Sequence, residues 1–210
     1  MDAVAALVLI FCPDVESIDM ATFKIMYNIE DPQLYQVFDK ATQLQQDGKL
    51  DDTQSLKELK FISFNRNVFD YVILSEPFKS DTLLALQSVE TVSIYGLDDM
   101  KDGMKDWKCM AHDLELLAGV MSKDNLGCLN DFSPRFPILK RLIYEHINSK
   151  SRKQIDRGIF NNGLAHLQST LEELTIIDTL LCIKGPAPIA SMASLRNFIY
   201  FHWHRHSSDI

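Results

Sequence analysis

Six short segments of the chain share one spacing of apolar residues. In each segment an apolar residue is followed by two more, three and five positions later. A strand alone alternates with period two, and a helix repeats its apolar positions at i, i+3, i+4 and i+7. The spacing therefore predicts a turn residue followed by two residues on one face of a short strand. The triplets are Val15/Ile18/Met20, Leu56/Leu59/Phe61, Val89/Val92/Ile94, Leu139/Leu142/Tyr144, Leu171/Leu174/Ile176 and Leu195/Phe198/Tyr200.

Helix-like sequence precedes several of these triplets. Residues 31–48 carry apolar side chains at i, i+3 and i+4, with Asp31-Pro32 as a start signal and Asp47-Gly48 as a stop. Residues 105–129 and 154–168 show the same periodicity. A repeated order of helix, turn and strand predicts parallel strands with the helices outside them.

The triplet spacing and the order of elements are those of leucine-rich repeats. We therefore expect an α/β fold, an irregular leucine-rich-repeat solenoid with parallel strands on the concave side and helices on the outer side. Residues 1–210 are interpreted as a single domain of this kind. The apolar segment 3–11 would be exposed at the end of a stack, which favours a piece of a longer repeat array. The alternative is an ordinary α/β domain with six strands.

The spacing of the triplets along the chain is irregular. Their first residues, at positions 15, 56, 89, 139, 171 and 195, are 41, 33, 50, 32 and 24 residues apart. Regular leucine-rich repeats are about 20–29 residues long. We therefore expect insertions or an extra helix in the long intervals, and residues 105–129 are the candidate for that helix.

Charge and cysteine content limit the class of partner and the compartment. The net charge of −8 argues against nonspecific binding to nucleic acid or to an anionic membrane. The apolar start is about ten residues long, too short to span a bilayer. The four cysteines form no CxxC pair, and no Asn-x-Ser/Thr acceptor occurs, which indicates a cytoplasmic or nuclear protein.

Three segments resemble the repeat regions of leucine-rich-repeat F-box proteins of filamentous fungi. Residues 11–18 (FCPDVESI) are similar to the strand entry CPNLE-L, and residues 136–142 (FPILKRL) and 194–198 (SLRNF) resemble stretches of that family. The resemblance implies a noncatalytic substrate-recognition region of a cullin-RING ubiquitin ligase, joined to it by an F-box that docks on a Skp adaptor. We find no F-box in this sequence. What the resemblance carries over is the repeat scaffold and a protein-binding role.

The repeat phase also predicts a partner-binding surface. If the triplets point into the core, the residues between and after them face the open concave side. A contiguous exposed apolar stripe there is typical of a binding surface, unless a loop or a further segment covers it. One column of this face is expected to hold Ile62, Tyr95, Ile177 and Phe201, and its neighbour Ile143 and Ile199.

Two groups of side chains leave metal or nucleophile chemistry open. In an extended strand His202, His204 and His206 would share one face, where imidazoles can ligate zinc. The alternative function is thus a metal-binding protein or a metal-dependent hydrolase, weighed against a solvated polar terminus. On a helix, Cys109 and His112 would also share a face and form a metal or nucleophile pair, weighed against a buried inert cysteine.

No motif in the sequence names a reaction. The chain contains no GxGxxG, P-loop or GxSxG, and its glycines are scattered, so no phosphate-binding loop is visible. We therefore expect a protein that is not an enzyme, with no catalytic residue and no cofactor.

Overall fold

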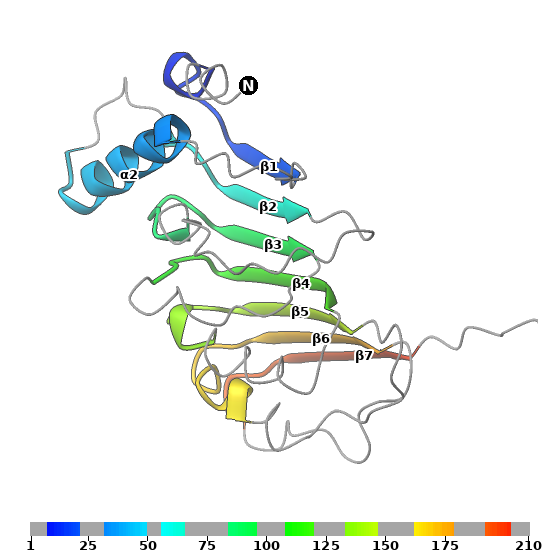
Figure 1. The fold of residues 1–210 in the computed structure, drawn as a ribbon. Coiled ribbons are helices and arrows are strands. Elements are labelled where there is room, and N and C mark those ends of the chain that lie inside the picture. The colour runs from blue at the N-terminus through cyan, green and yellow to red at the C-terminus, as the bar shows by residue number, and fades with distance from the viewer. Residues whose placement is uncertain are drawn as a thin grey trace, which may run out of the picture.

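The computed structural model describes residues 8–21, 32–49, 56–65, 84–95, 108–119, 133–146, 162–178 and 192–202. These residues form one open sheet of seven strands, in which the spatial order is the chain order and every neighbouring pair is parallel (Figure 1). The α/β class and the parallel strands are confirmed. The strands are β1 Ser17–Ala21, β2 Phe61–Asn65, β3 Thr91–Tyr95, β4 Asp113–Gly119, β5 Arg141–His146, β6 Glu173–Asp178 and β7 Asn197–His202, and the helices are α2 Pro32–Gln46 and the 3-10 turn η1 Ser133–Arg135.

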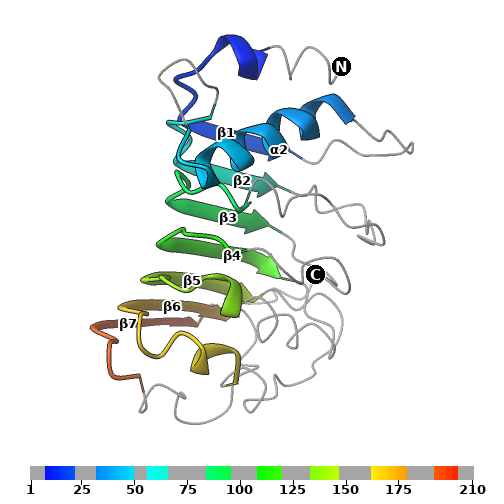
Figure 2. The ribbon, with the colours of Figure 1, turned by 90° about the vertical axis from the view of Figure 1, so that its left-hand side faces the viewer.

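Strands β2 to β6 bury one face in a continuous core, against which Ile18 of β1 packs partly buried. The residues at the second core position of each unit form a row across the sheet, because each is paired in register with its equivalent on the next strand. Phe38 and Ala41 of α2 join the same core cluster, and Figure 2 shows α2 lying across β1 and β2. The row consists of Ile18, Ile62, Val92, Leu114, Leu142, Leu174 and Phe198.

A repeated backbone contact holds successive strands in register. The Lys140 carbonyl, directly before β5, accepts hydrogen bonds from the N–H groups of Glu172 at 2.7 Å and Glu173 at 2.9 Å. Equivalent carbonyls accept two N–H groups from the next unit at every junction between described strands. Each junction pairs the two N–H groups at the start of the next strand. Neighbouring strands therefore cannot slide past one another without leaving these groups unpaired. The other carbonyls belong to Glu16, Lys60, Glu90, His112 and Glu172.

Helix α2 confirms the element expected over residues 31–48. It ends in a Schellman turn, in which the Gly48 N–H bonds to the Gln45 carbonyl and the Lys49 N–H to the Leu44 carbonyl. Gly48 has a φ of 62°, the left-handed conformation that glycine adopts without steric cost. The sequence signal Asp47-Gly48 therefore marks the end of the helix correctly.

The second predicted triplet, Leu56/Leu59/Phe61, is in the wrong register. Ile62 pairs with Ile18 and with Val92, so Leu59 and Ile62 occupy the first two core positions of this unit. Leu56 is buried too, but its carbonyl accepts a hydrogen bond from the Leu59 N–H and closes the turn before the strand. The same bond joins Leu86 to Val89, Phe136 to Leu139 and Met192 to Leu195.

The helix expected over residues 105–129 is contradicted where the structure describes this segment. Residues 113–119 form strand β4, and Ala111, Leu114 and Leu116 are buried at the three core positions. With both corrections the first core positions fall at 15, 59, 89, 111, 139, 171 and 195, which are 44, 30, 22, 28, 32 and 24 residues apart. The apparent interval of 50 residues thus came from the missed strand β4, whereas the interval before β2 is long because it contains helix α2.

Truncation of a central core residue tests this register. Leu174 is 1% exposed, and we expect Leu174→Ala to lower the free energy of unfolding by about 2–5 kcal/mol, because it leaves a cavity under β6. The exposed Lys140 holds the next unit through its backbone, so Lys140→Ala should change stability by less than about 0.5 kcal/mol. Urea denaturation followed by circular dichroism measures both, and equal midpoints for the two variants would contradict the core assignment.

Candidate functional site

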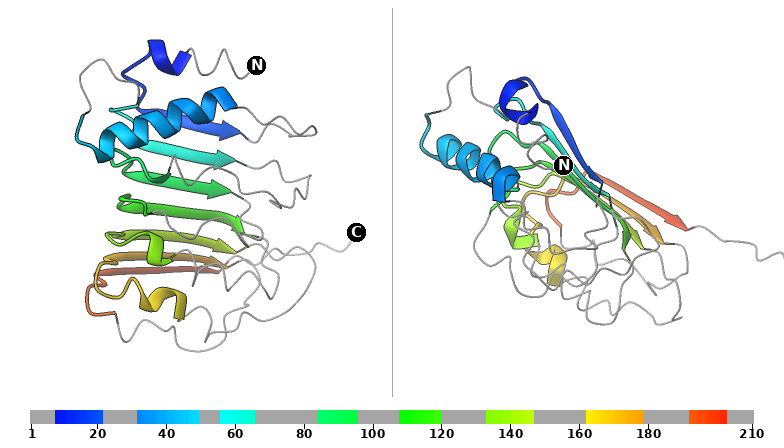
Figure 3. Two further views of the ribbon diagram at one scale, coloured as in Figure 1. Left: turned by 60° about the vertical axis from the view of Figure 1, so that its left-hand side comes forward. Right: turned by 45° about the horizontal axis from the view of Figure 1, so that its top comes forward.

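The face of the sheet opposite α2 is the candidate site. Figure 3 (right) shows α2 and the helical turn near residue 165 on one side of the strands and no described segment over the other side. Alternate residues of each strand therefore form columns on an open face. The middle column runs Asp19, Ser63, Ser93, Glu115, Ile143, Thr175 and Ile199 from β1 to β7.

The middle column of the open face is polar from β1 to β4 and contains isoleucines on β5 and β7. Ile143 and Ile199 lie in one column, each paired with Thr175 of β6, as the sequence predicts. In the next column Ile177 pairs with Phe201, again as expected. Ile199 is 47% and Phe201 57% exposed, while the two residues on the more central strands are half-buried. We call the four residues Ile143, Ile177, Ile199 and Phe201 the apolar patch.

The expectation that Ile62 lies on the open face is wrong. Its side chain is fully buried in the core, since the shift of the second triplet by three residues moves every residue of β2 to the opposite face. Phe61 and Ser63 take the places on the open face instead, paired with Ser17 and Asp19 of β1.

Tyr95 stands apart from the apolar patch. Its backbone pairs with Leu117 of β4, and its side chain lies outside the described residues. The register between β4 and β5 then shifts between Leu116 and Gly119, so the column does not continue straight into β5. The apolar column predicted from the sequence is therefore interrupted at β4, and the patch is confined to β5, β6 and β7.

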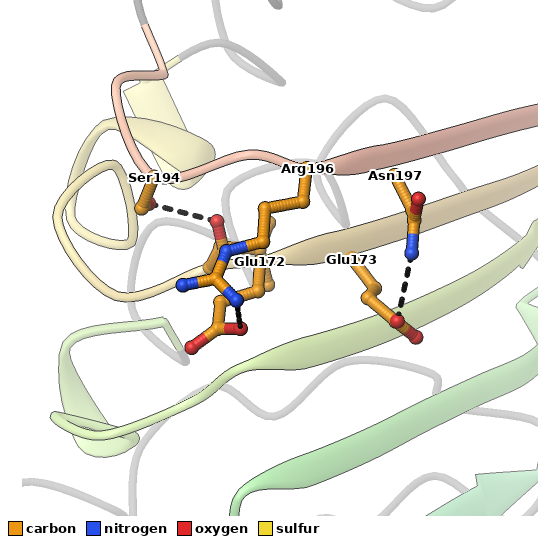
Figure 4. A network of polar contacts seen from close by, with 6 residues as sticks. Glu172, Glu173, Ser194, Arg196 and Asn197 are labelled. Carbon is orange, nitrogen blue, oxygen red and sulfur yellow. Dashed lines mark hydrogen bonds and ion pairs between the residues drawn. The ribbon is translucent and has the colours of Figure 1, made fainter.

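Polar side chains line the amino-terminal edge of the same strands. Arg141 contacts Asp113 at 2.7 Å between Nη2 and Oδ2, and the Asn197 side-chain amide donates to Glu173 Oε1 at 2.9 Å. Figure 4 shows the second of these bonds next to the Arg196–Glu172 ion pair, whose closest N and O atoms are 3.5 Å apart. The contacts are exposed, and each is worth about 0.2–1 kcal/mol. They give the apolar patch a polar border on one side, as in the rim of a protein interface.

The cysteine and histidine expected on one helix face are not arranged for chemistry. Cys109 is fully buried before β4, whereas His112 is exposed at the start of that strand. Burial raises the pKa of the Cys109 thiol to about 12, although a hydrogen bond with the Ala111 backbone acts in the opposite direction. The thiol is therefore protonated at neutral pH, and the buried inert cysteine is the better interpretation. Cys128 lies outside the described residues.

The histidine hypothesis is not tested by the structure. His202 ends β7 and its side chain is not described, and His204 and His206 lie beyond the described part of the chain. Among the residues that are described, no group of three or more His, Cys, Asp or Glu side chains is placed to hold a metal ion. The metal-binding function remains a prediction from the sequence.

Family models, curated proteins and solved structures give no match to the chain. No helix in the described ranges combines the length and apolar character required to cross a bilayer.

One structural feature was missed by the sequence reasoning. Phe198 and Tyr200 belong to the core-facing rows, yet they are 39% and 38% exposed. Their equivalents on β6, Leu174 and Ile176, are each 1% exposed, because β7 covers them. The triplet spacing is the same in both units. It therefore identifies which face of the strand points to the core, but not whether a further strand covers that face.

Thiol labelling tests the contrast between the two described cysteines. Cys12 is exposed and Cys109 buried, so a maleimide at pH 7.5 should label Cys12 rapidly and leave Cys109 unlabelled until urea unfolds the protein. The raised pKa also means that Cys109 favours the folded state below pH 9 and loses this contribution as the pH rises towards 12. Mass spectrometry of the labelled peptides makes the distinction, and rapid labelling of Cys109 in the folded protein would contradict its placement.

Proposed function

We propose that the protein is a noncatalytic protein-binding scaffold of the leucine-rich-repeat type. The observation that carries this proposal is the apolar patch, which joins the exposed Ile199 and Phe201 of β7 with the half-buried Ile177 of β6 and Ile143 of β5 on a face with no described covering. Clustered apolar side chains on an open surface are typical of protein interaction sites.

The repetition of one unit supports the leucine-rich-repeat assignment. A carbonyl before the strand accepts two N–H groups at each of the six junctions, and the units of β3 to β6 each bury three residues at i, i+3 and i+5. A turn closed by the same backbone bond precedes β2, β3, β5 and β7. From the second unit onward the spacing of 22 to 32 residues overlaps the length of regular repeats, about 20–29 residues, and exceeds it in two of the five intervals. Repeats that contact only their neighbours provide extended surfaces for binding other proteins.

The composition of the patch favours a protein partner. Phe201 offers a large aromatic side chain beside its register partner Ile177, and Ile143 and Ile199 add branched aliphatic groups on the same face, so an apolar side chain of a partner would be desolvated there. Full burial of a side chain such as Phe is worth about 1.5–3 kcal/mol. The strands hold these side chains on paired backbone, which reduces the entropy lost on binding.

The resemblance to fungal F-box proteins suggests the biological setting. A substrate-recognition region of a ubiquitin ligase binds its target through the repeats, and the open face offers the surface for such a target. Recognition of a protein destined for ubiquitination, in the cytoplasm or the nucleus, is the form of the proposal that this resemblance supports.

Charged substitutions in the patch test the proposal. We expect Ile177→Asp with Phe201→Asp to weaken partner binding at least about tenfold, because a buried unpaired carboxylate opposes the contact. The partner is first recovered with the wild-type chain and identified by mass spectrometry, and its dissociation constant is then measured by calorimetry. Recovery of a Skp adaptor would extend the proposal to ligase assembly.

The control for this experiment is Met110→Asp. Met110 is 38% exposed, and it precedes β4 outside the open face, so its substitution should leave the affinity unchanged. Circular dichroism melting establishes that all variants are folded. An unaltered dissociation constant for a folded double variant would remove the apolar patch as the binding site.

A further inference from the structure

The backbone groups at the two ends of the sheet are complementary. At each of six junctions a pre-strand carbonyl accepts two N–H groups from the next unit, and Arg196 is the seventh residue at this position. Because the Asn197 N–H points to Glu172 of β6, the Arg196 carbonyl in the same trans peptide points away from β6. Within the described residues no N–H group pairs with it.

The opposite edge offers the matching donors. The Glu16 carbonyl faces β2, so the Ser17 N–H in the same peptide points outward from β1. The N–H groups of Glu16 and Ser17 are the equivalents of the two donors at every internal junction, and in the described part of the chain neither has a backbone acceptor. One end thus presents an acceptor and the other end two donors, in the same position of the unit.

The side chains at this position add charge complementarity. From β1 to β7 they are Glu16, Lys60, Glu90, His112, Lys140, Glu172 and Arg196, an alternation of acidic and basic residues around one histidine. The last junction is joined by the ion pair of Arg196 with Glu172. A further strand beyond β7 would continue this alternation if it placed an acidic side chain next to Arg196. The exposed Glu16 at the other end of the sheet is such a side chain.

Exposed apolar side chains gather at the same two ends. Among the described residues eight large apolar side chains are exposed, and seven of them belong to β7 or to the helical turn 8–11 before β1. Figures 1 and 2 place this helical turn beyond β1, at the end of the stack farthest from β7. At the β1 end these are Val8, Ile10 and Phe11, and at the β7 end Phe198, Ile199, Tyr200 and Phe201.

We propose that the β7 edge docks a second copy of this chain, which adds its β1 as a further parallel strand. The register of the internal junctions would pair Asn197 with Ser17 and Phe198 with Ile18 of the second copy. The Arg196 carbonyl would accept the Glu16 and Ser17 N–H groups, and its guanidinium would lie between Glu172 and Glu16 of the second copy. The contact is head to tail, so it leaves a free edge at each end and allows further copies to add.

Antiparallel pairing of two β7 edges lacks this complementarity. The β7 sequence, residues 197–202, contains no acidic side chain to meet Arg196. Such pairing also forms a closed dimer, whereas the head-to-tail contact forms longer assemblies. The two arrangements therefore differ in their size distribution and in their dependence on β1.

Sedimentation velocity of the full chain tests the proposal through the β1 backbone. We expect the weight-average mass of the wild-type chain to rise above that of two copies as the protein concentration increases from about 1 to 200 μM. This range detects contacts of weak to moderate affinity. Ser17→Pro removes the outward N–H and keeps the bonds to β2, and proline is tolerated at the first residue of an edge strand. This variant should stay monomeric, while Ser17→Ala, which retains the N–H, should assemble like the wild type.

A charge exchange provides the second measurement. Arg196→Glu and Glu16→Arg should each weaken assembly at low salt by about threefold or more, since each places like charges at the contact. An equimolar mixture of the two variants restores opposite charges at every junction and should recover assembly, which also shows that neither variant is misfolded.

Two results would overturn the proposal. One is a wild-type chain that remains monomeric over the whole concentration range. The other is an assembly that persists in Ser17→Pro, which would assign the contact to β7 alone or to the apolar patch. The proposal concerns the edges of the sheet and is independent of the protein-binding function proposed for its open face.

Discussion

The pairing of one pre-strand carbonyl with two N–H groups of the next unit is the contact on which the structure depends. It recurs at every described junction and sets the register of each strand before any side chain is considered. Because the register is fixed, equivalent residues line up across the sheet, and the alternation of a strand then assigns every row to one face. The core, the open face and the complementary edges all follow from this single repeated bond.

The sequence predicted the class of fold because the residues of the core rows recur in it with one apolar spacing. It predicted β2 in the wrong register because the turn before this strand places an apolar residue, Leu56, three positions before the first core residue, Leu59. Leu56, Leu59 and Ile62 are therefore evenly spaced, and two overlapping triplets fit the same segment. Strand β4 was missed because Met110, Leu114 and Leu117 have the i, i+4 and i+7 spacing of a helix, and this concealed the triplet of Ala111, Leu114 and Leu116 in the same segment.

The residues of the candidate site could be predicted only on the strands whose register was predicted correctly. Ile143 and Ile199 share a column, and Ile177 pairs with Phe201, because the last three triplets were placed correctly and alternation fixes their outward neighbours. Ile62 was misplaced because a shift by an odd number of residues exchanges the two faces. The interruption of the column at β4 arises from a register shift between Leu116 and Gly119. No residue pattern in the sequence indicates this shift.

The exposure of equivalent core residues depends on whether a neighbouring strand covers them. Leu174 on β6 is 1% exposed because β7 covers it, whereas Phe198 in the same row is 39% exposed at the end of the stack. In a stack whose units contact only their neighbours, each unit is stabilised by the next, and the last one retains unsatisfied apolar area and backbone groups. A strand that docks at β7 would therefore gain the burial and the paired hydrogen bonds that already join β6 to β7. Such a strand must continue the charge alternation and the two core rows. It therefore needs an acidic residue followed two and four positions later by apolar residues. Residues 16, 18 and 20, in and directly before β1, have this pattern.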